Sequence, residues 1–146
     1  DSELDKIGEN ANIVDARSIH ANTELESIFD NRGHAVIWNP WDKSGTNAHW
    51  IVLVRKGNDI YHFDSFGLKN DILKPELIEI CKKNNNNLYD NTTTYQHENS
   101  NCCGRYCCLV VLLNKKTNNF IEIENILNNI EEDFGLDDWL LNNIDE

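Results

Sequence analysis

The sequence predicts an α+β domain whose antiparallel or mixed sheet packs against helices. Three apolar, β-branched segments, at 34–39, 48–55 and 59–65, are separated by short polar turns, a pattern typical of a strand meander. The segments that flank this meander carry helical periodicity instead. The 146 residues suffice for one domain spanning 1–146, with a core that needs no disulfides.

The N-terminal part is expected to contribute one short helix. Residues 1–21 have weak periodicity and are expected to be partly irregular. Asn22 and Thr23 can cap a helix, and the Asn-Arg-Gly run at 31–33 ends it. Its buried face would hold three apolar side chains, those of Leu25, Ile28 and Phe29.

The three strands of the meander follow. The first, at 34–39 (HAVIWN), is β-branched and is followed by a polar loop. The second, at 48–55 (AHWIVLVR), is apolar almost throughout, as expected of a strand that is buried on both faces. A turn centred on Gly57 leads into the third strand at 59–65 (DIYHFDS).

The segment between the meander and residue 100 mixes helix and strand signals. A helix is expected from about residue 70 to 83, with its stable part beginning near Pro75. The polar run at 84–87 is expected to be a surface loop. The β-branched run at 92–96 (TTTYQ) predicts another strand.

Helices are expected to complete the chain. The segment 103–113 is apolar all round and predicts a buried helix. The segment 118–130 is amphipathic, and a last short helix is expected at 139–144.

The charge and the cysteines restrict the class of protein. The formal net charge is −12, so DNA is not expected as a partner, because nucleic-acid binding needs a basic surface. The lysines at 69, 74, 82 and 83 fit a solvated helix face. No apolar run reaches the ~20 residues of a membrane span. Four of the five cysteines cluster at 102–108, which fits a reducing compartment better than a disulfide framework.

Cys103 is the candidate nucleophile. It is expected at the start of the 103–113 helix, where unpaired N–H groups and the helix dipole favour a thiolate. Gly104 follows it and leaves room for a substrate to approach the backbone. Taken alone, Cys103 fits a small buried core residue better than a nucleophile.

His49 and Asp64 are the candidate base and its orienting acid. They stand near matched positions of the hairpin that turns at Gly57, and facing side chains of such a hairpin lie ~5 Å apart. A carboxylate at that distance can hold an imidazole in one tautomer. The side-chain amide of Gln96, together with the Cys103 N–H, can stabilise an oxyanion. A structural histidine and a surface glutamine remain the alternatives.

Together, AHWIVLV, YHFDSFG and the Gln-x6-Cys-Gly pattern resemble the adenovirus-type cysteine proteases, which belong with the proteases of SUMO and other ubiquitin-like proteins. His49-Trp50 matches the start of one family strand, and Asp64-Ser65-Phe66-Gly67 the end of the next. Gln96 and Cys103-Gly104 complete the match, which spans residues 48–110.

The resemblance implies a papain-like core and peptide-bond hydrolysis through an acyl-enzyme. Trp50 would roof a narrow channel that favours glycine beside the cut, and Gly104 would also contact substrate. It further implies a viral or virophage maturation protease that cleaves capsid or core precursors in the virion or at an intracellular assembly site, in the host cytoplasm or nucleus. No cofactor, metal or membrane is implied, and a peptide activator stays open.

Other interpretations stay open at this stage. The same fold could remove ubiquitin-like modifiers as an isopeptidase, or could bind without catalysis. Cys102 is an alternative nucleophile, because its spacing of six from Gln96 occurs in the SUMO-protease branch. A metal-binding module is a further class, and it would use five residues: Cys102, Cys103, Cys107, Cys108 and His97.

Overall fold

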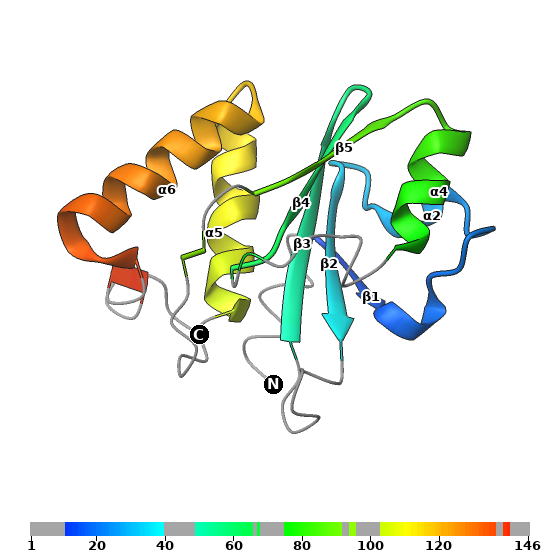
Figure 1. The fold of residues 1–146 in the computed structure, drawn as a ribbon, viewed down its shortest axis with the longest axis horizontal. Helices are drawn as coiled ribbons and strands as arrows, with labels where there is room; N and C mark the ends of the chain where they lie inside the picture. The colour runs from blue at the N-terminus through cyan, green and yellow to red at the C-terminus, as the bar shows by residue number, and fades with distance from the viewer. Residues whose placement is uncertain are drawn as a thin grey trace.

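The computed structural model places five strands in one sheet with helices on both of its faces (Figure 1). The strands are β1 (Asn12–Asp15), β2 (His34–Asn39), β3 (His49–Lys56), β4 (Asp59–Phe63) and β5 (Asn87–Asp90). The helices are η1 (Ala16–Ser18), α2 (Leu25–Ile28), α4 (Glu76–Lys83), α5 (Cys103–Lys116) and α6 (Phe120–Phe134). The structure describes residues 11–39, 49–65, 67, 75–91, 94–95, 103–136 and 139–140, with the backbone alone at 39, 103 and 104.

The sheet is mixed, and its strands lie side by side in chain order. β2, β3 and β4 form the predicted antiparallel meander. β1 runs parallel to β2 at one edge, and β5 runs parallel to β4 at the other. The α+β class is therefore confirmed, and the sheet is the mixed form of the two that the sequence allowed.

The register of the β3–β4 hairpin differs from the prediction. Lys56 pairs with Asp59, so the turn consists of the two residues Gly57 and Asn58 rather than three residues centred on Gly57. Gly57 takes a φ of 59°, which a residue with a side chain adopts only with strain. The shorter turn places His49 and Asp64 diagonally across the hairpin and not directly opposite one another.

The parallel edge strands were not predicted. β1 lies in the segment 1–21 that was expected to be partly irregular, and β5 begins inside the expected loop at 84–87. The predicted strand at 92–96 is wrong where it is described, because Thr94 and Tyr95 lie outside any strand. Edge strands of four residues are stabilised by pairing with β2 or β4, and local propensity is too weak to reveal them.

Two hydrophobic cores lie on opposite faces of the sheet. Alternation along β3 sends Val52 and Val54 towards α5 and α6, and Ile51 and Leu53 towards α2 and α4. α5 is not buried all round as predicted, because Leu112 on its outer side is 39% exposed. The sheet covers one side of this helix, and α6 covers only part of the rest.

The expected start of one helix is confirmed, and the expected cap of another is not. α4 begins after Pro75, and the Asn119 side chain caps α6 by accepting the Glu122 N–H at 3.0 Å. The expected cap of α2 is wrong, since Thr23 Oγ1 instead accepts the His20 N–H at 2.8 Å. Trp139 and Leu140 are helical, as expected for 139–144, whose other residues lie outside the described part.

Among the described residues, no helix is both long and apolar enough to cross a membrane.

The C-terminal end of α5 is anchored to the sheet by polar contacts. Lys56, the last residue of β3, donates from Nζ to the carbonyls of Asn114 (2.8 Å) and Thr117 (2.9 Å). These carbonyls lie at a helix end, where a cation also meets the negative end of the dipole.

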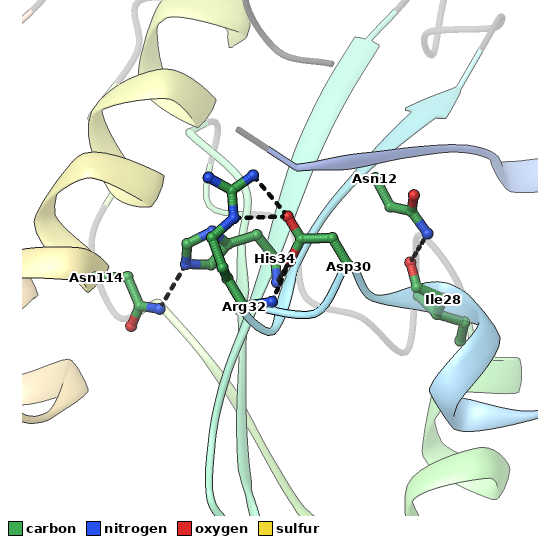
Figure 2. A network of polar contacts seen from close by, with 6 residues as sticks. All are labelled: Asn12, Ile28, Asp30, Arg32, His34 and Asn114. Carbon is green, nitrogen blue, oxygen red and sulfur yellow. Dashed lines mark hydrogen bonds and ion pairs between the residues drawn. The ribbon is translucent and has the colours of Figure 1, made fainter. Parts of the chain in front are cut away.

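A polar network, buried at its contact between His34 and Asn114, adds a second anchor (Figure 2). Asn114 Nδ2 lies 3.0 Å from His34 Nε2, which joins α5 to the start of β2. Asp30 accepts the His34 backbone N–H at 2.9 Å and an Arg32 guanidinium N–H at 3.0 Å. Partial burial raises the pKa of Asp30, but these hydrogen bonds and the nearby positive charge outweigh it, so the pKa lies below its usual value.

Candidate active site

His49 and Asp64 are in direct contact. His49 opens β3, Asp64 follows the last residue of β4, and His49 Nε2 bonds to Asp64 Oδ1. The carboxylate is fully buried and the His49 side chain is 8% exposed, so little solvent screens the interaction. A carboxylate on Nε2 favours the tautomer with its proton there, which leaves Nδ1 as the basic ring atom.

Asn91, Gly67 and Tyr95 fix the backbone at Asp64 and Ser65 by hydrogen bonds. Asn91 accepts the Asp64 N–H on Oδ1 at 3.0 Å and donates from Nδ2 to the Asp64 carbonyl at 2.9 Å. The Gly67 N–H donates to the same carbonyl at 2.9 Å, and the Tyr95 N–H donates to Ser65 O at 2.9 Å. The backbone N–H and the backbone carbonyl of Asp64 are therefore both held in place.

The start of α5 lies at the same end of the sheet as this pair. The bonds from Lys56 join the last residue of β3 to the last turn of α5. From this common end, the eight residues of β3 extend back about 23 Å, and the fourteen of α5 about 20 Å. Because the two elements run side by side in the same direction, they begin at the same end of the sheet, β3 with His49 and α5 with Cys103 (Figure 1).

The other predicted site residues are described only in part. Cys103 is the first residue of α5 and Gly104 the second, but the Cys103 side chain lies outside the described part. Gln96 and the alternative nucleophile Cys102 also lie outside it. The predicted oxyanion donor and the choice of thiol therefore stay predictions.

Trp50 lies on the face of the sheet that α5 covers. It is half-buried, pairs with Trp38 in the β2–β3 ladder, and its ring centroid is 6.3 Å from that of Trp38. Trp38 was not predicted, because its place beside Trp50 near the end of the neighbouring strand follows only from the register. Asn91 was not predicted either, since no sequence motif marks it.

A second histidine–carboxylate contact lies nearby in the sheet. His62 Nδ1 is 3.0 Å from Asp90 Oδ1, and the His62 side chain is fully buried. The angles are not those of a hydrogen bond, since neither ring nitrogen of His62 has a hydrogen-bond partner. The His49–Asp64 pair is therefore hydrogen-bonded, whereas the His62–Asp90 pair is not.

The described residues hold no cluster of three or more potential metal ligands. Cys81 is a buried free thiol, and burial raises its pKa. His97 and Cys102, which belong to the alternative metal-binding set, lie outside the described residues.

No family model and no curated protein matches the sequence. Among solved structures, the central domain of the uncharacterized Lpg1148 protein from Legionella pneumophila is similar to this chain, with a TM-score of 0.43. The two share 17% sequence identity over 89% of this chain and 83% of that one.

Proposed function

We propose that this protein is a cysteine endopeptidase with a papain-like core. Cys103 is the nucleophile, His49 the base, Asp64 the acid that orients the base, and Gln96 an oxyanion donor. The observation that supports the proposal best is the buried hydrogen bond between His49 and Asp64, at the end of the sheet where α5 begins. A base held in one tautomer beside a helix N-terminus is what a catalytic thiol requires.

In the first half of the reaction, His49 Nδ1 takes the proton of the Cys103 thiol. The thiolate attacks the peptide carbonyl carbon and forms a C–S bond, while the carbonyl oxygen becomes an oxyanion. The Cys103 backbone N–H and the Gln96 side chain donate to that oxygen. The C–N bond then breaks, and His49 returns its proton to the leaving amine.

In the second half, water releases the acyl group. His49 takes a proton from the water, whose oxygen attacks the thioester carbon. The C–S bond breaks, the carboxylic acid leaves, and the thiolate recovers its proton from His49. Throughout both halves, the Asp64 carboxylate stabilises the imidazolium without accepting its proton.

The substrates would be polypeptides with glycine beside the cut. Trp50 with Trp38 forms an aromatic surface on one side of β2 and β3, close to where His49 opens its strand. Large rings beside the nucleophile leave little room for a Cβ, which favours glycine. Viral capsid or core precursors are the proposed natural substrates, through the resemblance in sequence motifs.

Cleavage of a peptide library, read by mass spectrometry, tests the proposal. The wild-type chain should cut after glycine, and Cys103→Ala and His49→Ala should each abolish cutting, because the two residues act as one unit. Cys108→Ala is the matched control, since it removes another thiol of α5 and should keep full activity. If His49→Ala keeps more than about a tenth of the wild-type kcat, the proposed base is wrong.

Alkylation identifies the thiol independently of any substrate. At mildly acidic pH an ordinary thiol, with a pKa of ~8.5, barely reacts, whereas a thiolate paired with imidazolium does. The label should map to Cys103 and disappear in His49→Ala. A label found mainly on Cys102 would show that Cys102, and not Cys103, is the nucleophile.

A further inference from the structure

We infer that Asn91 is a positioning residue for the catalytic carboxylate, which holds the main chain of Asp64 so that the carboxylate meets His49. Its effect on hydrolysis rests on the proposed function. Its effect on the His49 ring does not, because the hydrogen bond between His49 and Asp64 is a feature of the fold.

The Asn91 side chain replaces a strand partner at the point where the sheet ends. β4 ends at Phe63, and the β4–β5 ladder has His62 opposite Asp90 as its last pair. Asp64 follows the last residue of β4, and Asn91 follows the last residue of β5. These two residues are joined through a side chain and not through a further backbone pair of the ladder. The side-chain amide of Asn91 binds both polar groups of the Asp64 main chain. Its Oδ1 accepts the Asp64 N–H at 3.0 Å, and its Nδ2 donates to the Asp64 carbonyl at 2.9 Å.

Both hydrogen bonds of this contact are buried. Asn91 and Asp64 are both fully buried, and the Asn91 N–H also donates to His62 O at 3.3 Å. Two parallel bonds to one main-chain unit fix both its position and its rotation, as they do between neighbouring strands. Because Asp64 has only two side-chain torsions, its backbone orientation largely decides where the carboxylate points.

Loss of the Asn91 amide would leave a buried N–H of Asp64 without its acceptor, and the chain would shift to recover one. A shift of about 1 Å at a catalytic group can lower the rate ~10²-fold. The His49–Asp64 bond would lengthen, and the imidazolium would lose its nearest negative charge. A buried asparagine with a merely structural role would lower stability instead and leave the titration of His49 unchanged.

The decisive measurement is an NMR titration of the His49 imidazole nitrogens. The Cys103→Ala background removes coupling with the thiol, so the midpoint reports only the surroundings of the ring. In this background Asp64→Asn should lower the midpoint by about one pH unit or more, since the nearby negative charge is lost. Asn91→Ala should lower it by half of that change or more, and adding Asn91→Ala to Asp64→Asn should lower it no further.

Asn114→Ala is the matched control. It also removes a buried, hydrogen-bonded asparagine, but at the far end of α5, so it should reduce stability without moving the His49 midpoint. In the wild-type background, Asn91→Ala should lower kcat about tenfold or more and leave KM unchanged.

A folded Asn91→Ala variant with an unchanged His49 midpoint would overturn the inference. If Asn91→Ala does not fold, Asn91→Ser decides, because its hydroxyl can still meet one group of Asp64 and should give a smaller shift. If neither variant folds, Asn91 is a structural residue and the inference fails. A wild-type chain without peptidase activity would refute the proposed function alone, since the midpoints would still test Asn91.

Discussion

Replacing Gly67 by alanine should destabilise the segment that follows Asp64, the proposed orienting acid. Gly67 has a φ of 80°, and a Cβ placed there would overlap Thr94 Oγ1 and lie 3.4 Å from Thr94 Cα and Cβ. The left-handed backbone costs an alanine about 1–2 kcal/mol. Forcing an extra carbon into a packed site adds about 1–3 kcal/mol, so the expected loss is about 2–5 kcal/mol in the free energy of unfolding.

Gly57→Ala separates the two contributions. Gly57 also has a positive φ, of 59°, but a Cβ there would meet nothing within 4 Å. Urea denaturation should therefore show a loss of only about 1–2 kcal/mol for Gly57→Ala. The Thr94→Ala change removes the overlapping oxygen and should recover about 1–2 kcal/mol of the Gly67→Ala loss in a double-mutant cycle.

Equal losses for Gly67→Ala and Gly57→Ala would refute the crowding argument. So would a double-mutant cycle without coupling between positions 67 and 94. Gly67→Ala should also reduce hydrolysis, because the Gly67 N–H donates to the Asp64 carbonyl. A large loss of stability with unchanged kcat would show that this bond does not help to place the acid.

Three further outcomes are expected. In urea denaturation, Lys56→Met should lower the free energy of unfolding by about 2 kcal/mol, because two charged hydrogen bonds to the end of α5 are lost. The control Lys116→Met, at an exposed lysine, should change the free energy of unfolding by less than about 0.5 kcal/mol. Asp64→Asn should lower kcat less than Cys103→Ala does, as measured by steady-state kinetics, because the acid orients the base and does not react. The pKa of Asp30 lies lower in the folded than in the unfolded chain. The ionised Asp30 carboxylate therefore stabilises the fold fully above about pH 4, and this stabilisation is lost as the pH falls through the folded pKa. Asp30→Asn should flatten the acid limb of a curve of unfolding free energy against pH.

Local pattern was sufficient for the long elements. The meander of β2, β3 and β4 was predicted from apolar, β-branched runs, α5 from a segment that is apolar all round, and α6 from an amphipathic pattern. These segments bury many side chains of their own, so their composition carries the signal of burial. The candidate base and acid could be named for the same reason, since the hairpin between them is a local structure.

The edges and the supporting contacts depended on the tertiary structure. β1 and β5 are held by pairing with strands that lie about twenty to thirty residues away, and their own residues give no strand signal. The ring pair of Trp38 with Trp50 follows from a register, which the turn geometry fixes. Periodicity within one segment carries no information about these partners.

The sequence by itself determined which residues can do chemistry, because a thiol, an imidazole and a carboxylate are recognisable by type and by their order along the chain. Only the tertiary structure decided how Asp64 is held. Asn91 reaches it across 27 positions with two hydrogen bonds, and nothing in the residue type distinguishes this asparagine from the others. Hydrogen bonds between distant backbone and side-chain groups depend on where the chain brings them together, and that position is set by the packing of the whole sheet.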